Sequence, residues 1–392
     1  MHRAPVTRPW LAVLVACLSA GASAPGEPQT ASTAKVGKVM LYVGTYTSGE
    51  SKGIYRFHLD PATGALSPAG EPTESVSPSF LAFHPSRRFL YAVNETGDAP
   101  NDPSGAVSAF AVDPATGGLT FLNQQPSGGA APCHVTIDKE GRHAIVANYW
   151  GGTVEVLPIQ ADGRLGPPSM VLRHQDRSTR PGRPPKPHPH STNLDAANRF
   201  AFVADLGLDE VVAYRFDAKT GRLAPHESGS VRLAAGAGPR HLAFHPDGRQ
   251  AYVINELDST ITRLAYDAAT GAMTVGQTVS TLPPGFQGKN STAEVVVHPD
   301  GTLLFGSNRG HDSIAIFTID KATGVLTAAG HQPTGGKTPR NFAIDPTGAY
   351  LLAANQDSDT IAVFRIDRAS GRLAPVGRPV RVPRPVCLKM MR

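Results

Sequence analysis

The stretch PRHLAFHPDGRQAYVINELDSTITRLAYDAATGAM, residues 239–273, is the clearest copy of a unit that recurs along the chain. It holds three runs of β-forming residues, HLAFH, AYVIN and TITRLAY. A HPDG turn separates the first two runs, a polar NELDS loop separates the next two, and a DAATG turn follows the third. The stretch therefore predicts three strands of a four-stranded antiparallel sheet.

The turn pattern D-x-x-[TS]-G-x-[LM] sets the period of this unit. It begins at Asp60, Asp113, Asp217, Asp267, Asp320 and Asp367, and a degenerate copy, QADGRL, lies at 160–165 inside the longest gap. Seven units of about fifty residues result, which is a period typical of propellers. We predict one all-β domain, a seven-bladed β-propeller with four antiparallel strands in each blade.

The two ends of the repeat carry complementary parts of one unit. MLYVGTY, which begins at Met40, matches the second strand of the unit, so the first unit lacks its first strand. PVCLKM, residues 385–390, resembles that missing first strand. We therefore expect a propeller domain over 39–392, whose ring is closed by N- and C-terminal strands that share one blade and leave no free sheet edge.

The amino terminus is expected to be an export signal. Arg3 and Arg8 flank the start of an apolar run over 10–20, and the small residues GASA follow, so 1–24 is predicted to be a signal peptide. Cys17, in LVAC, offers an alternative in which a lipoprotein signal leaves an acylated cysteine and a lipid anchor. Residues 25–38 have the composition of a linker. The expected location is periplasmic or secreted, without a membrane span.

The net charge argues against a nucleic-acid partner, and the cysteines argue against a disulfide. Removal of Arg3 and Arg8 lowers the formal charge from +5 to +3 (5 − 2), which is too small to indicate nucleic acid. Cys133 and Cys387 each lie in an apolar, strand-like run and are expected to be buried free thiols rather than a disulfide. We expect a monomer that acts on a small molecule.

Topology separates the scaffold from the site. The turns that recur in every unit, including those with His84, His245 and His298, fall on one face of the disc and are interpreted as structural. The other face carries the starts of first strands and the ends of second strands, where the units differ and polar residues gather. These are Ser79, Cys133, His134, His188, His190, Arg240, His241, Glu294 and Arg340, with Tyr46, Asn94, Glu95, Asn148, Tyr149, Asp205, Asn255, Glu256, Asn308, Arg309, Asn355 and Gln356. Each alone could be a polar strand cap, but their convergence indicates a site for an anionic or polyol ligand.

Several of these segments resemble one known family. YVGTYT, CHVTID, ANYWGGTVEV, HPHSTNLD, GPRHLAFHPDGRQAYVINE, SNRGHDSI and RPVCLKM are similar to segments of the seven-bladed propeller lactonases, which include a 6-phosphogluconolactonase and a carboxymuconate lactonising enzyme. The resemblance implies a lactone hydrolase with catalytic residues His190, Arg240, Glu256 and Arg309. Residues on the same face predicted to bind the substrate are Tyr46, Glu95, His134, Asn148, His188 and Arg340.

These residues are suited to opening a lactone without a cofactor. His190 could act as the base, the two arginines could stabilise the oxyanion or hold an anionic group, and Glu256 could orient one of them. No cluster of His and Cys residues with zinc-type spacing occurs in the chain. No metal site is predicted, although a calcium site from Glu95, Asn148 and Asp205 stays open. The Arg- and Pro-rich loop at 173–187 could clamp an anion or simply be solvated.

Two other functions stay open at this point. One is a non-catalytic propeller that binds a ligand or partner in the cell envelope, and the other is a lactonising cycloisomerase of the muconate type. Export argues against a phosphorylated, cytosolic substrate. Replacement of Arg240 by alanine should lower turnover at least about a hundredfold. It should leave the melting temperature nearly unchanged, because an arginine on the rim buries little apolar surface.

Overall fold

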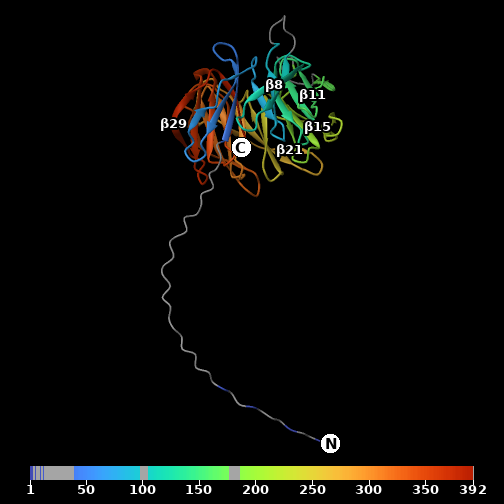
Figure 1. Ribbon diagram of the computed structural model, residues 1–392, viewed down its shortest axis with the longest axis vertical. Helices are drawn as coiled ribbons and strands as arrows, with labels where there is room; N and C mark the ends of the chain where they lie inside the picture. Colours follow the sequence, from blue (N-terminus) through green and yellow to red (C-terminus); the bar gives the residue numbers. More distant parts are fainter. Residues whose placement is uncertain are drawn as a thin grey trace. The chain divides into compact units, whose positions relative to one another are not determined.

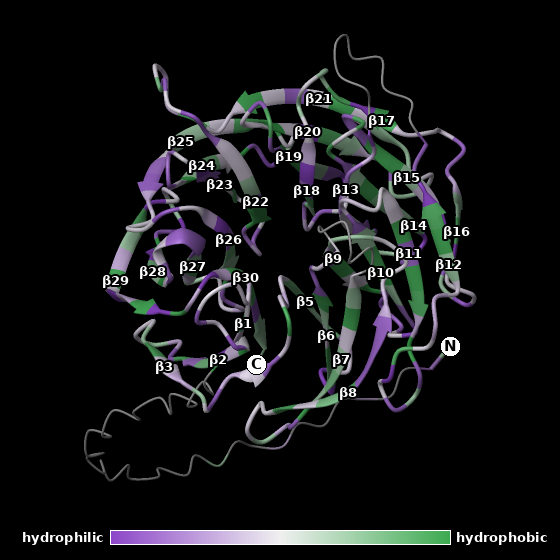
Figure 2. Ribbon diagram, turned by 90° about the horizontal axis from the view of Figure 1, so that it is seen from above, coloured by the Kyte–Doolittle hydropathy of each residue, from purple (hydrophilic) through white to green (hydrophobic). Residues whose placement is uncertain are grey.

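Seven small antiparallel sheets are arranged around a common axis, seen from the side in Figure 1 and from above in Figure 2. The computed structural model describes residues 39–97, 105–175 and 186–391, with five single positions before residue 13. In each sheet the four main strands lie side by side in chain order, apart from the sheet that holds both chain ends. Within the described ranges the helical structure is one short 3-10 turn, η1 (Gln356–Ser358). The predicted all-β, seven-bladed propeller is confirmed.

The strands keep to the period read from the sequence. The blade that joins the chain ends contains β30 (Pro385–Met391), β1 (Val39–Thr45), β2 (Gly53–Leu59), β3 (Leu66–Pro68) and β4 (Thr73–Glu74). The next three are β5–β8 (Phe80–Phe83, Phe89–Asn94, Ala106–Val112, Leu119–Pro126), β9–β12 (Pro132–Ile137, His143–Asn148, Thr153–Pro158, Met170–Arg173) and β13–β17 (Pro189–Leu194, Phe200–Asp205, Glu210–Asp217, Arg222–Pro225, Val231–Arg232). The last three are β18–β21 (Pro239–Phe244, Gln250–Asn255, Thr260–Tyr266, Met273–Ser280), β22–β25 (Ser291–Val297, Leu303–Arg309, Ser313–Ile319, Leu326–Pro333) and β26–β29 (Pro339–Ile344, Tyr350–Asn355, Thr360–Ile366, Leu373–Arg381).

The chain ends close the ring as predicted. β30 pairs antiparallel with β1, from Met40 opposite Met391 to Thr45 opposite Pro385. The innermost strands contact one another in the order β30, β5, β9, β13, β18, β22, β26 and back to β30 (Figure 2). Because every inner strand has a neighbour on both sides, ring closure leaves the channel wall without a gap between blades.

The recurring Asp-Gly turns join each blade to the next. Oδ1 of Asp113 accepts hydrogen bonds from the backbone N–H groups of Ala115 and Thr116, at 2.9 and 2.8 Å. Gly117 has φ of 68°, a left-handed conformation that favours glycine. Its carbonyl accepts a hydrogen bond of 2.8 Å from the phenol of Tyr42 in the neighbouring blade. The repetition of this motif is therefore explained by packing between blades.

The turn histidines have a similar structural role. In each case the ring Nε2–H donates to a backbone carbonyl of the next blade. The pairs are His84 with Gly141 (2.9 Å), His245 with Gly301 (2.8 Å) and His298 with Gly348 (2.9 Å). These contacts agree with the interpretation of the three histidines as parts of the scaffold.

Cys133 and Cys387 are buried and free, as predicted. The predicted signal peptide (1–24), including Cys17, and the linker (25–38) fall outside the described residues except for the five single positions, as do 176–185 of the basic loop. In the part of the chain that the structure describes, no helix is both long enough and apolar enough to span a bilayer.

Candidate functional site

A β-bulge near the start of the inner strands builds one mouth of the channel. In β13, Pro189 pairs with Asp205 and Ser191 pairs with Ala204, so His190 is the extra residue between them. A bulge turns the extra side chain away from its regular direction in the sheet. The same irregularity, after a strand-initial proline, occurs at Cys133, His190, Arg240, Arg340 and Val386. Proline suits this position because the first residue of a strand can lack a backbone donor.

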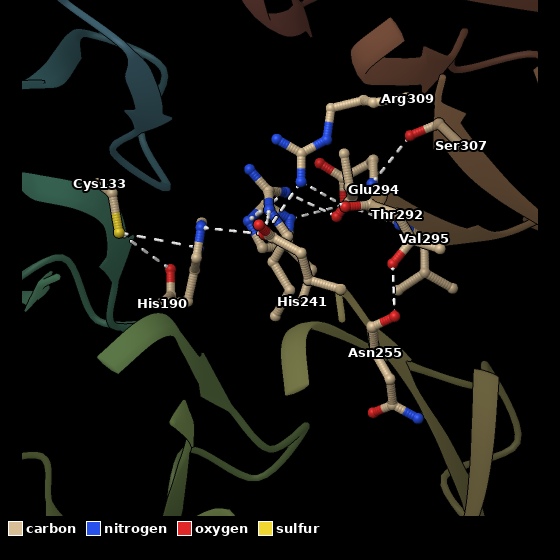
Figure 3. Close-up of polar contacts among 12 residues, drawn as sticks. Cys133, His190, His241, Asn255, Thr292, Glu294, Val295, Ser307 and Arg309 are labelled. Carbon is tan, nitrogen blue, oxygen red and sulfur yellow. Dashed lines mark hydrogen bonds and ion pairs between the residues drawn. The ribbon is translucent and has the colours of Figure 1, made fainter. Parts of the chain in front are cut away.

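The four residues predicted to be catalytic lie together around one carboxylate. Oε2 of Glu256, the residue directly after β19, is 3.0 Å from Nε of Arg240 and 3.0 Å from Nη2 of Arg309. It is 4.0 Å from Nε2 of His190. Figure 3 shows His190 and Arg309 pointing into the same space from different blades. The structure therefore brings His190, Arg240, Glu256 and Arg309 into one cluster from three adjacent blades, which we call the Glu256 cluster.

Three of the predicted binding residues extend this cluster. The phenol of Tyr46 donates a hydrogen bond of 2.9 Å to Oε1 of Glu95, and the guanidinium of Arg340 lies over the Tyr46 ring, 5.4 Å from its centre. Burial alone would lower the pKa of Arg340, but Tyr46, Glu95 and then Glu256 raise it above its ordinary value. Arg340 therefore stays charged and adds a third guanidinium to the site.

Asn148 makes its side-chain contacts outside this cluster, so the structure gives no support to its predicted role in binding. Its side chain is fully buried, and Nδ2 donates to the carbonyl of Ser127 at 2.6 Å and to the hydroxyl of Thr153 at 3.0 Å. Asn308 and Asn355, at the same position in other blades, donate in the same way to the carbonyls of residues 281 and 334. The recurring asparagine therefore holds the backbone that connects one blade to the next.

The other two predicted binding residues, His188 and His134, lie next to the cluster. The ring of His188 stacks on Tyr149 with centres 4.5 Å apart, and its Nδ1 is 2.9 Å from the Tyr149 carbonyl. His134 lies further along the channel, with its ring 4.1 Å from that of Phe80 and 5.4 Å from that of His241. His134 also lines a channel cavity of about 540 Å³ together with His241.

The calcium alternative is not supported by the positions of its three ligands. Oδ1 of Asp205 accepts a hydrogen bond from the backbone N–H of His188 at 2.8 Å, and its Oδ2 is 2.7 Å from Nδ1 of His174. Glu95 accepts from Tyr46, and the amide of Asn148 donates to the carbonyl of Ser127 between two blades. Among the described residues, no group of three or more His, Cys, Asp or Glu side chains is arranged to hold a metal ion.

Arg240 lies deeper than expected. Only 3% of the residue is exposed, and Nη1 donates to the carbonyl of Ala293 at 2.6 Å. The expectation of a rim arginine with little buried area is therefore wrong, because the bulge turns this side chain inward, into the channel mouth. A buried guanidinium that is paired with a carboxylate is costly to remove.

The charges of the cluster are set by burial and by mutual pairing. Burial alone would raise the pKa of Glu256, but Arg309 and Arg240 hold it below its usual value, so the carboxylate stays ionised. Burial lowers the pKa of Arg309 to about 10, although Glu256 acts in the opposite direction. Burial and the charge of Arg240 lower the pKa of His190 well below 6.5. At neutral pH the cluster thus presents a neutral imidazole beside charged guanidinium groups.

Two residues that the sequence placed on this face, Cys133 and Ser79, were not assigned a catalytic or binding role. Sγ of Cys133 donates to the His190 carbonyl at 3.3 Å and lies 3.7 Å from Nδ1 of the same ring. Burial raises the pKa of this thiol, so it is protonated and a poor nucleophile. Oγ of Ser79 is buried and has no hydrogen-bond partner among the described residues. Each directly follows a proline, Pro132 in β9 and Pro78 just before β5, and this recurring signal could have marked them.

The fold and the cluster define a class of propeller with a largely buried group of charged side chains at one mouth of its channel. The model of the family "Lactonase, 7-bladed beta-propeller" matches residues 40–390, and the chain belongs to this family. This confirms the family predicted from the sequence and makes the protein an enzyme of the lactonase type, a carboxylic ester hydrolase.

Relatives with similar sequences and structures cover nearly the whole propeller. The 6-phosphogluconolactonase of Bacillus subtilis is 37% identical over 354 residues, which are 90% of this chain and 99% of the relative. That of Formosa agariphila is 31% identical and covers 78% of this chain and 86% of its own. The periplasmic gluconolactonase of Pseudomonas aeruginosa has a TM-score of 0.85 and 34% identity, over 91% of this chain and 99% of that structure.

Proposed function

We propose that the protein hydrolyses a sugar lactone at the Glu256 cluster, with water as the nucleophile. The observation that carries this proposal is one neutral, buried imidazole beside two guanidinium groups that share a single carboxylate. Ester hydrolysis needs a base for the attacking water and positive charge where the carbonyl oxygen becomes negative. The names of the relatives support a lactone as the substrate.

His190 is the better candidate for the base. Oε2 of Glu256 is already paired with two arginines, which stabilise the ionised carboxylate. His190 is neutral at pH 7 and so can accept the proton of the attacking water. Once protonated, its ring would have Glu256 4.0 Å from Nε2, which stabilises the imidazolium. The two side chains thus take different roles.

The arginines supply the positive charge. Arg240 and Arg309 hold their guanidinium groups beside one carboxylate, at 3.0 Å each, and keep donors for a developing oxyanion. Arg340, on the Tyr46 side, adds a charge that suits an anionic or strongly polar substituent of the substrate. Because these groups are largely buried, their electrostatic effect is larger than it would be in water.

The reaction balances without another reactant. The oxygen of water bonds to the lactone carbonyl carbon while His190 takes a proton from that water. The tetrahedral intermediate then breaks the ring C–O bond, and the proton passes to the ring oxygen, which leaves as a hydroxyl. The product is an open-chain hydroxy acid, which releases one proton at neutral pH. We propose that neither a metal nor a cofactor takes part.

The ratio of kcat/KM values for a phosphorylated and an unphosphorylated sugar lactone tests the choice of substrate. We expect the unphosphorylated sugar lactone to be preferred, because an exported enzyme would not meet a cytosolic phosphate ester. An unsaturated dicarboxylate lactone serves as the third substrate, and its preferential turnover would favour the muconate-type alternative. Preference for the phosphorylated sugar would overturn the proposed substrate but not the reaction.

We also propose that the protein acts in the cell envelope. The purified mature chain is expected to lack residues 1–22 or 1–24, or to begin at an acylated Cys17. Intact-mass measurement on protein from the envelope fraction decides between these forms. Recovery of the full-length chain from the cytosol would contradict export. It would also remove the argument against a phosphorylated substrate.

The pH dependence tests the assignment of the base. As the pH falls, His190 becomes protonated and can no longer accept the proton of water, so activity is lost. Because burial and Arg240 lower its pKa, this loss is expected below pH 6.5, the ordinary histidine value. The profile of kcat/KM against pH reports on the free enzyme. An acid limb centred at or above pH 6.5 would show that another group is the base.

A further inference from the structure

A second layer of inner-strand residues lies next to the bulged residues, further along the channel. The residues of this layer that carry polar side chains are His134, Ser191, His241, Glu294 and Asn341. Glu294 is the centre of a buried network among them. Its Oε1 is 2.9 Å from Nδ1 of His241, and its Oε2 accepts a hydrogen bond from the amide of Asn341. His241 in turn lies beside Arg240 of the Glu256 cluster, with its Nε2 3.2 Å from Nη1 of the guanidinium.

The partners of His241 determine which of its nitrogens carries the proton. A guanidinium only donates hydrogen bonds, so Nε2 of His241 must accept from Nη1 of Arg240. The proton is therefore on Nδ1, where it donates to the carboxylate of Glu294. The His241 ring and the Glu294 side chain are 6% and 11% exposed, so water competes little for these contacts. One neutral tautomer satisfies both neighbours.

We propose that His241 and Glu294 are positioning residues that hold Arg240 in its working orientation. This proposal rests on the lactonase function proposed above. Nη1 of Arg240 is fixed by His241 and by the carbonyl of Ala293, and Nε faces Glu256. As the oxyanion forms, the guanidinium of Arg240 interacts with it as well as with Glu256. The two contacts at Nη1 keep the guanidinium in place during this step. A preorganised donor avoids reorientation during the reaction.

The carboxylate of Glu294 suits this role better than an amide. Both of its oxygens accept hydrogen bonds, from His241 and the backbone N–H of Val295 on one side and from Asn341 on the other. The amide of Asn341 is itself oriented, because its Oδ1 accepts the backbone N–H of Leu388 in the closing strand β30. The chain of hydrogen bonds therefore runs from the strand that closes the ring to the arginine of the site.

Protonation of His241 would break this arrangement. It would place a second N–H and a positive charge against the guanidinium of Arg240. The titratable and charged groups around His241 are Arg240 on its own strand, Glu294 on β22, Lys389 on β30, His134 on β9 and His190 on β13. Burial lowers the pKa of His241, and Glu294 raises it by a smaller amount. The neutral form is therefore present at pH 7.

Two substitutions at His241 test the proposal through activity. His241→Phe keeps a flat ring but removes the acceptor, and we expect kcat to fall about 10- to 100-fold with little change in KM, the range for partners that orient a catalytic group. His241→Gln offers a carbonyl oxygen to Arg240 and should recover part of that loss. Ser191→Ala is the matched control, because Ser191 lies in the same layer and bonds to Asn193. An unchanged kcat in His241→Phe would overturn the proposal.

Side-chain ¹⁵N NMR of His241 gives a readout that does not depend on activity. The wild-type protein is expected to show a protonated Nδ1 and an unprotonated Nε2, and Glu294→Leu should lose this pattern. A wild-type Nε2–H tautomer would overturn the positioning role even if the enzyme is active. Failure of the proposed function would look different, because the Nδ1–H tautomer would be present while the wild-type protein released no acid from any lactone.

Discussion

Replacing Arg240 with alanine is expected to lower kcat at least about a hundredfold, the typical loss when one oxyanion donor is removed. Initial rates of acid release from a sugar lactone measure this effect. The substitution also removes one of two arginines from Glu256 and an N–H donor from the Ala293 carbonyl, so we expect the melting temperature to fall as well. The loss of rate must therefore be measured below the unfolding transition.

His245→Ala is the matched control for this experiment. The residue is five positions away in sequence, but it lies in a turn on the opposite face, where its ring bonds to the carbonyl of Gly301. We expect turnover to be unchanged and the free energy of unfolding to fall by about 1 kcal/mol, the value of one such hydrogen bond. If His245→Ala abolished turnover and Arg240→Ala did not, the site would lie on the other face.

Deletion of residues 383–392 is expected to unfold the domain. The segment contains β30, whose side chains Val386 and Leu388 are 3% and 2% exposed, and each such side chain contributes about 1.5–3 kcal/mol of burial. Its loss also exposes a sheet edge of β1 and breaks the contacts with β5 and β26. Since total stabilities are about 5–15 kcal/mol, little would remain.

Far-UV circular dichroism during a thermal scan measures the effect of this deletion. The deleted chain should show no cooperative transition, whereas a chain that lacks only residue 392 should melt like the wild type. A cooperative transition of the deleted chain near the wild-type temperature would show that the propeller is stable as an open ring. The role assigned to β30 in ring closure would then be wrong.

The scaffold was predictable from the sequence because each blade repeats the same local physics. The Asp and Gly of each turn satisfy one hydrogen-bonding pattern and one left-handed backbone angle, so a single motif identified the period. The lone first-strand pattern at 385–390 identified the ring closure in the same way. Residues that recur in every blade therefore predict the scaffold.

The candidate site was predictable only in part, because side-chain direction depends on the bulges. Topology placed Arg240 and Glu256 on the same face, where the structure pairs them, but pattern alone did not reveal that the bulge buries the arginine against Ala293. The prediction for Asn148 treated all residues at the ends of second strands alike, although the recurring asparagine there bonds within the scaffold. The contact between His241 and Glu294 joins neighbouring blades and has no signal in local sequence.

The most direct test of the central claim is the rate of acid release from gluconolactone at constant pH by the purified mature protein. A chelator is present throughout, and His190→Ala is measured beside the wild type. We predict steady acid release by the wild-type protein that the chelator does not reduce, and a rate at least about a hundredfold lower for the variant. Equal rates for the two proteins, or no release above the spontaneous rate, would contradict lactone hydrolysis at this site.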